Sequence, residues 1–96
     1  MIGLVATMKI QDGKAEEFEQ IFRDLAAKVK ANEPGALLYQ LTKSRTEANT
    51  YKVMEMYADQ AAIDHHAGTD YFKAAGRSLG ACLDGRPQME FLDAVE

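Results

Sequence analysis

The hydrophobic periodicity of this chain changes several times, and the order of those changes limits the folds that it can adopt. Residues 2–9 form a short run of strand-forming side chains that the turn signal QDGK stops. From Lys14 the apolar residues recur at helical spacing. This helix should end at NEPG, 32–35, because Pro34 lacks an amide proton and disfavours helix at the residue before it. The apolar stripe of the helix consists of Phe18, Ile21, Phe22, Leu25 and Val29.

The middle of the chain predicts a hairpin followed by a short helix. Residues 36–44 and 50–58 have the composition of strands, and the polar segment 45–49 lies between them. Asp59 is a suitable N-cap for a helix over 60–67, since its carboxylate can accept hydrogen bonds from the first free amides.

The last third of the chain predicts another helix and a final strand. Thr69 or Asp70 can cap this helix, which is expected to run to about Leu83, and residues 88–94 follow as a strand. The predicted order is therefore β-α-β-β-α-β with the second helix split in two. This is the ferredoxin-like arrangement, an α+β fold with helices on one face of an antiparallel sheet, here as one domain over residues 1–96.

The predicted sheet carries apolar side chains on both faces. In 36–44, alternation puts Leu37 on the same face as Tyr39 and puts Leu38 on the opposite face, which the next strand extends with Met54. Because helices cover only one face, the other predicts a homodimer with the two sheets face to face. The alternative is a monomer with ordinary scattered apolar surface residues.

Composition argues against several classes of partner and cofactor. The net charge of −4 disfavours nucleic acid and anionic membranes as partners. A single cysteine, and no apolar run near the roughly 18–20 residues needed to cross a bilayer, predict a cytoplasmic protein. The sequence has no phosphate-binding glycine loop and no Cys–His cluster, so no metal, flavin or dinucleotide cofactor is expected.

Both histidines of the chain lie side by side in the predicted helix over 60–67. Successive helical residues are rotated by about 100°, so His65 and His66 cannot point the same way and do not form a paired metal site. With Ile63 facing the core, His66 faces inward and His65 outward. His66 is therefore a candidate catalytic residue, or else a hydrogen-bonded packing residue.

Glu55 is an unusual residue for its position. Alternation places it between Val53 and Tyr57, on a face that is otherwise apolar or aromatic. An unpaired buried carboxylate costs on the order of several kcal/mol, so Glu55 needs a raised pKa or a partner such as a tyrosine hydroxyl or a protonated histidine. The alternative is a cross-strand ion pair with Lys43 or Arg45 at the sheet margin.

Tyrosines and two glycines complete the residues of interest. Tyrosine offers aromatic surface with a polar tip, which suits a planar phenolic ligand as well as a core. Gly76 and Gly80 lie one turn apart in the last predicted helix, a spacing that permits close backbone contact. The tyrosines are Tyr39, Tyr51, Tyr57 and Tyr71.

Three blocks of the chain together resemble the antibiotic biosynthesis monooxygenase (ABM) domain family: EPGALLYQL at 33–41, YKVMEMYADQAAIDHHAGTDYF at 51–72, and LDGRP at 83–87. The resemblance covers nearly the whole chain and implies a dimeric ferredoxin-like α/β barrel. It also implies an inward glutamate, an aromatic residue two positions later, a helical histidine and a following phenylalanine. In this chain these are Glu55, Tyr57, His66 and Phe72. The aromatic residue is usually tryptophan in the family, and this chain has none.

The resemblance implies oxygenation of phenols or quinols by O₂ without metal, flavin or haem. His66 would deprotonate the substrate with Glu55 orienting or charging it, while Tyr39 and Tyr57 hold the ring, and Tyr71 and Phe72 also bind the substrate.

Other family activities remain open alternatives. Haem degradation is disfavoured, because the first strand has Ala6 and Thr7 where those relatives have asparagine, and the chain lacks their tryptophan. Isomerisation of a phosphorylated quorum-sensing signal molecule would also suit proton transfer by His66. The third alternative is a non-catalytic dimeric ligand-binding module.

Overall fold

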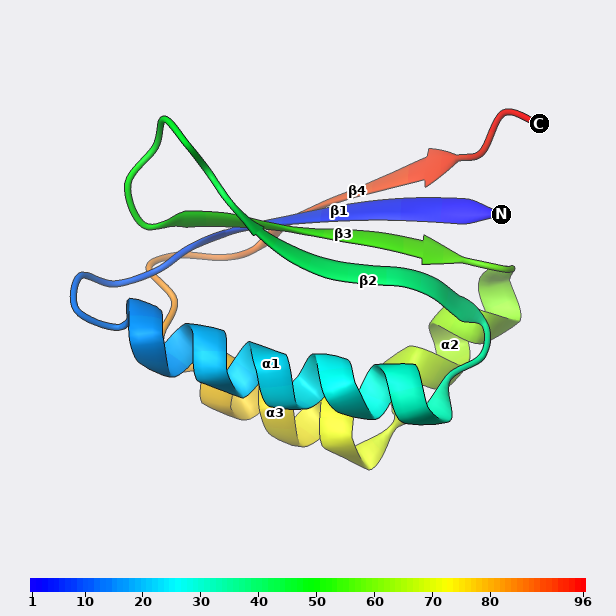
Figure 1. Cartoon of the computed structure of the whole chain (residues 1–96), viewed down its shortest axis with the longest axis horizontal. Coiled ribbons are helices and arrows are strands. Elements are labelled where there is room, and N and C mark those ends of the chain that lie inside the picture. The colour runs from blue at the N-terminus through cyan, green and yellow to red at the C-terminus, as the bar shows by residue number, and fades with distance from the viewer.

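The computed structural model describes all 96 residues, as a four-stranded antiparallel sheet with three helices on one face (Figure 1). The strands lie in the order β2-β3-β1-β4. This confirms the predicted ferredoxin-like α+β order with a split second helix. Along the chain the elements are β1 (Ile2–Lys9), α1 (Ala15–Asn32), β2 (Ala36–Lys43), β3 (Thr50–Tyr57), α2 (Gln60–Gly68), α3 (Asp70–Gly80) and β4 (Gln88–Asp93).

Side-chain caps set the beginnings of the two short helices. The Asp59 carboxylate accepts a hydrogen bond from the Ala62 amide at 2.9 Å and starts α2. The Thr69 hydroxyl accepts one from the Phe72 amide at 3.3 Å and starts α3. These contacts satisfy amides that have no partner within the helix.

The helix α3 ends at Gly80, earlier than the predicted end at about Leu83. The chain leaves the helix here because Leu83 forms an isolated antiparallel bridge with Ile10, and the backbone follows that extended pairing instead.

None of the three helices combines the length and the apolar composition that crossing a membrane requires.

A β-bulge interrupts β2 near its start. Ala36 pairs with Tyr57 and Leu38 with Met56, so Leu37 has no partner on β3. The prediction that Leu37 shares a face with Tyr39 is therefore wrong: the Leu37 side chain is 53% exposed, whereas Tyr39 is buried.

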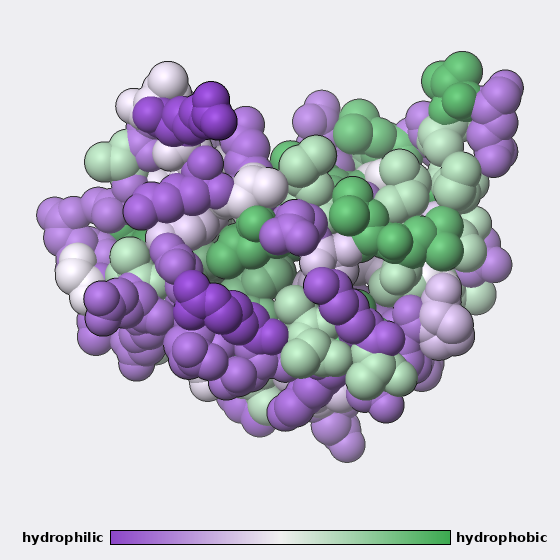
Figure 2. Space-filling view, in the orientation of Figure 1, coloured by the Kyte–Doolittle hydropathy of each residue, from purple (hydrophilic) through white to green (hydrophobic).

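The main core lies between the sheet and the helices, and the stripe of α1 packs into it through Phe18, Phe22, Leu25 and Val29. The opposite sheet face carries the large exposed apolar side chains of Leu38 and Met54, as predicted, and also that of Leu92 on β4. Figure 2 shows hydrophobic atoms gathered at the end of the sheet that carries both termini, whereas α1 and the β2–β3 loop are largely hydrophilic.

Candidate functional site

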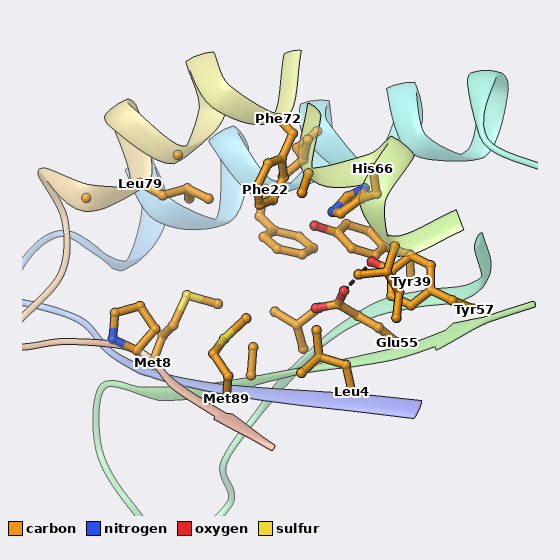
Figure 3. A pocket seen from close by; sticks show the side chains of 18 of the residues that line it. Leu4, Met8, Phe22, Tyr39, Glu55, Tyr57, His66, Phe72, Leu79 and Met89 are labelled. Carbon is orange, nitrogen blue, oxygen red and sulfur yellow. Dashed lines mark hydrogen bonds between the residues drawn. The ribbon is translucent and has the colours of Figure 1, made fainter. Parts of the chain in front are cut away.

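A cavity of about 370 Å³ lies between the inner face of the sheet and the helices α2 and α3 (Figure 3). Fifteen of its 20 lining residues are hydrophobic. The strand β4 borders it with Met89 and Phe91, which pair with Ala6 and Leu4 and remain largely exposed because no helix covers them. The volume and lining are those of a site for a small apolar molecule.

The few polar groups of the cavity come from three different elements. Tyr39 on β2 pairs directly with Glu55 on β3, so both side chains project from the same face of the sheet. The helix α2 brings His66 over them, with its ring centroid 5.2 Å from that of Tyr39. His66, Tyr39 and Glu55 are only 5%, 6% and 8% exposed.

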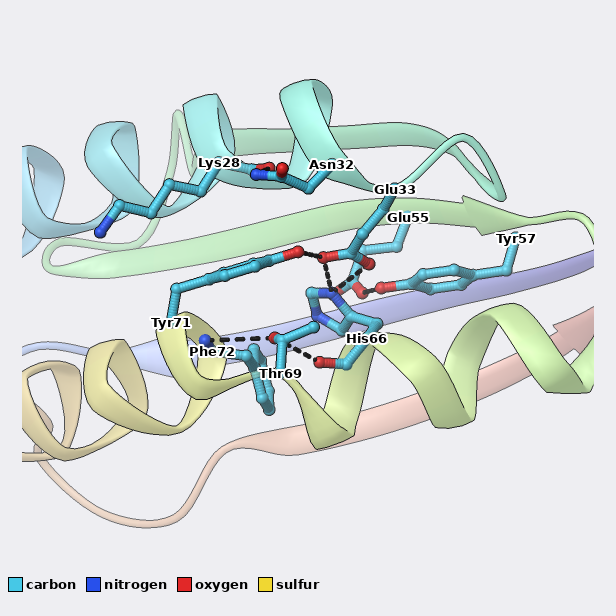
Figure 4. A network of polar contacts seen from close by, with 9 residues as sticks. All are labelled: Lys28, Asn32, Glu33, Glu55, Tyr57, His66, Thr69, Tyr71 and Phe72. Atoms are coloured by element: carbon cyan, nitrogen blue, oxygen red, sulfur yellow. Dashed lines mark hydrogen bonds and ion pairs between the residues drawn. The ribbon is translucent and has the colours of Figure 1, made fainter.

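The buried carboxylate of Glu33 forms hydrogen bonds with the imidazole ring of His66 (Figure 4). The Nδ1 atom of His66 lies 2.9 Å and 3.2 Å from the two oxygens of Glu33, and the Tyr71 hydroxyl donates to the same carboxylate. Because a carboxylate accepts hydrogen bonds, we assign the proton of neutral His66 to Nδ1. Its Nε2 atom then carries a lone pair.

Three polar atoms in the cavity have no hydrogen-bond partner within the protein. His66 bonds only through Nδ1, Glu55 accepts the Tyr57 hydroxyl on Oε1 alone, and the Tyr39 hydroxyl makes no hydrogen bond. Since no fully enclosed side-chain nitrogen or oxygen lacks a partner, Nε2 of His66, Oε2 of Glu55 and the Tyr39 hydroxyl each keep some accessible surface, and all three residues line the cavity. A bound molecule can therefore reach an acceptor, a carboxyl group and a donor at the same end.

Burial shifts the titration of these groups. It lowers the pKa of His66 below its ordinary value, which favours the neutral imidazole, and the neighbouring Glu33 opposes this shift. It raises the pKa of Glu55 to about 7, although the hydrogen bond from Tyr57 acts in the opposite direction. Burial, with the charge of Glu55, also raises the pKa of the Tyr39 hydroxyl, which remains a donor. The site thus offers a neutral base beside a carboxyl group that can hold its proton.

Gly35 brings Glu33 and His66 together. A Cβ atom on Gly35 would lie 2.7 Å from the Cβ atom of Ala62, so only glycine lets α2 pack this closely against the start of β2. The Ala58 amide also donates to the Gly35 carbonyl at 2.9 Å. Glu33 lies just before this contact in the chain, and His66 lies one helical turn after Ala62.

The inward position of His66 and the exposed position of His65 agree with the helical rotation argument. The carboxylate that binds His66 is Glu33, however, and not Glu55 as the resemblance implied. In the sequence, Glu33 stands out only as part of the helix-ending NEPG segment. Its one signal was its place at the start of the first family-like block, directly before Pro34.

The partner of Glu55 is the Tyr57 hydroxyl, which was one of the alternatives considered. The cross-strand ion pair does not form, because Glu55 pairs with Tyr39 across the sheet while Lys43 pairs with Tyr51. No group of three or more histidine, cysteine, aspartate or glutamate side chains is arranged to hold a metal ion.

The remaining predicted residues divide between the cavity and its surroundings. Tyr57 and Phe72 line the cavity, with the Phe72 ring 4.4 Å from that of His66. Tyr71, predicted to bind substrate, lies outside the lining and contacts Glu33 instead. Gly76 and Gly80 line the cavity, and the close backbone contact that their spacing permits does not form.

Comparisons with known proteins identify the family of this chain. The family model described as "Antibiotic biosynthesis monooxygenase" matches residues 1–78. A Caulobacter crescentus protein, whose crystal structure is described as that of "a putative antibiotic biosynthesis monooxygenase", is 63% identical with a TM-score of 0.97, and the match covers 99% of this chain and 90% of that one.

Two further relatives are more distant. The Bacillus subtilis protein "Putative monooxygenase YcnE" is 34% identical over 82 residues, which cover 82% of this chain and 85% of that protein. A Synechocystis protein described as "Uncharacterized protein sll1783" is 30% identical over 71 residues, or 74% of this chain. The match spans 48% of the length of that protein.

Proposed function

The chain belongs to the antibiotic biosynthesis monooxygenase family, and we propose that it oxygenates a small quinol-like or phenolic substrate with O₂, without a bound cofactor. The names of its relatives support a monooxygenase-like function in general. The observation that carries the finer proposal is the free Nε2 atom of His66, which faces an apolar cavity while Glu33 holds the opposite side of the ring.

His66 acts as the general base in this proposal. The substrate hydroxyl donates to Nε2 and transfers its proton there, and the Glu33 carboxylate on Nδ1 stabilises the resulting imidazolium. General-base assistance of this kind contributes roughly 10²- to 10⁴-fold in rate. The Tyr39 hydroxyl lies at the same end of the cavity and can donate to the aryloxide oxygen.

The substrate itself supplies the electrons for oxygen reduction. The aryloxide passes an electron to O₂, the two radicals combine to form a carbon–oxygen bond, and the protonated His66 returns its proton to the resulting peroxide anion. Loss of the proton on that carbon and of hydroxide, together one water, then breaks the O–O bond and leaves a quinone. Overall, a phenol and O₂ give a quinone and water. The apolar lining serves this step because it keeps bulk water from the aryloxide and admits the apolar O₂ molecule.

The alternative isomerase activity fits the cavity less well. A phosphorylated ligand would need cationic side chains, yet no lysine or arginine lines the cavity, and Glu55 would lie beside the phosphate. A neutral hydroxyarene meets no such repulsion. A non-catalytic binding module would accept the same ligands and differ only in leaving O₂ unconsumed.

Oxygen uptake with a panel of hydroquinones and anthrols, with and without chelator, tests the proposal. The wild type should consume O₂ irrespective of chelator, and His66→Ala should lower the rate about 100-fold or more. His65→Ala is the matched control, because this exposed neighbour should leave the rate unchanged. No uptake above background by the wild type would contradict the monooxygenase proposal.

We also propose that the chain is a homodimer that packs through the exposed apolar face of the sheet, around Leu38, Met54 and Leu92. Met54→Lys should shift the sedimentation coefficient from dimer to monomer, because it places a charge in the centre of this face. A stable monomer of the wild type at micromolar concentration would refute the homodimer.

A further inference from the structure

The helix α3 carries two glycines that leave open space where this helix lines the cavity. Gly76 and Gly80 both line the cavity, and a Cβ atom on either would meet no atom within 4 Å. Glycine inside a helix is less favourable than alanine, so these positions weaken α3 without serving a close backbone contact. The space that they keep open is therefore available to a bound molecule.

The two ends of the cavity differ in chemistry (Figure 3). His66 and Glu55 lie at one end, together with the Tyr39 hydroxyl, and each of these buried side chains offers an unpartnered polar atom. At the other end the walls are Met8, Leu79 and Met89. A molecule that fills the whole cavity therefore places an apolar part at this second end.

The volume exceeds the need of a single ring. A cavity of roughly 150 Å³ is enough to bind benzene, whereas this cavity measures about 370 Å³. A phenol bound at His66 would leave the space below Gly76 and Gly80 unfilled, and the apolar walls there would stay without contacts.

Building on the proposed function, we propose that the site selects hydroxyarenes that carry an apolar extension opposite the hydroxyl group. The hydroxyl lies at His66, and the extension, a short alkyl chain or a fused ring, lies below Gly76 and Gly80 against Met8 and Met89. The two glycines are then specificity-determining residues, because they set the length of the ligand that the cavity accepts.

Anaerobic binding of para-alkylphenols, measured by calorimetry, tests this selection. For the wild type, affinity should rise roughly two- to fourfold for each methylene from phenol to para-hexylphenol. Gly76→Leu and Gly80→Leu should abolish this rise while phenol still binds, since leucine fills the space below α3. Gly68→Leu is the matched control: Gly68 ends α2, also has no atom within 4 Å of its Cβ position, and does not line the cavity.

Leucine favours helix over glycine, so these variants should fold, and a cooperative thermal unfolding transition is the check. A wild-type affinity that does not change with chain length would overturn the proposal. Equal weakening of phenol and para-hexylphenol by both leucine variants would also overturn it. So would a changed sedimentation coefficient in these variants, because a second copy of the chain would then occupy the space. Binding is measured without O₂, so absence of oxygen uptake would count against the proposed function alone.

Discussion

Replacing Glu55 by glutamine would change the charge of the cavity with little change in its shape. Burial raises the pKa of this carboxyl group from 4.5 to about 7, because the apolar surroundings disfavour the ionised form. Glutamine keeps an oxygen that can accept the Tyr57 hydroxyl and has no proton to lose. The variant therefore isolates the free energy of ionising Glu55 inside the protein.

The sign and size of the effect follow from the two pKa values. Unfolded Glu55 loses its proton near pH 4.5 and folded Glu55 near pH 7, so between these values the folded state holds more protons. The free energy of unfolding of the wild type then falls as the pH rises through this window. A pKa difference of this size corresponds to about 3 kcal/mol.

Urea unfolding of both proteins at a fixed protein concentration measures the effect. The free energies of unfolding should agree below pH 4.5, and the variant should become more stable as the pH rises, by about 3 kcal/mol above pH 7. Glu47→Gln, at an exposed position in the β2–β3 loop, is the control and should show no such pH-dependent difference. A constant difference between pH 4.5 and pH 7 for Glu55→Gln would refute the reasoning, because Glu55 would then ionise as readily in the folded as in the unfolded chain.

Two further substitutions test the support of His66. Glu33→Gln should lower the free energy of unfolding by about 1–3 kcal/mol, because an amide accepts the two hydrogen bonds from His66 and Tyr71 less well than a carboxylate does. Urea unfolding and imidazole ¹⁵N shifts that both match the wild type would contradict this prediction. Gly35→Ala should cost about 1–3 kcal/mol, because the new Cβ atom would lie 2.7 Å from that of Ala62. If Gly35→Ala unfolded in urea at the same concentration as the wild type, α2 would be able to move away from the new Cβ atom without cost.

Local signals predicted most of the fold, because the decisive patterns lie within single elements. The helical stripe of α1 and the cap at Asp59 depend only on nearby residues, and both form as expected. The same holds for His66, whose direction follows from the rotation between successive helical residues. The bulge at Leu37 and the early end of α3 depend instead on pairing with distant segments. The hydrophobic periodicity within one segment carries no information about such pairing.

The candidate site was predictable only in part for the same reason. Alternation marked Glu55 as an inward carboxylate, and the tyrosine at the second position after it proved to be its partner. Glu33 lies 33 residues from His66 in the chain and ends a helix, so nothing local distinguishes it from an ordinary capping segment. Tyr71, predicted to bind substrate, does not line the cavity, and its hydroxyl donates to Glu33 instead.

The rings around His66 have a consequence for its protonated form. The ring centroids of Phe72, Tyr39 and Tyr57 lie 4.4, 5.2 and 5.6 Å from that of the imidazole. A cation within about 6 Å of an aromatic centroid can gain cation–π attraction from the ring, and this attraction strengthens where water is excluded. In the proposed reaction, any of these rings that presents its face to the imidazole would also compensate in part for the charge that His66 acquires on accepting a proton.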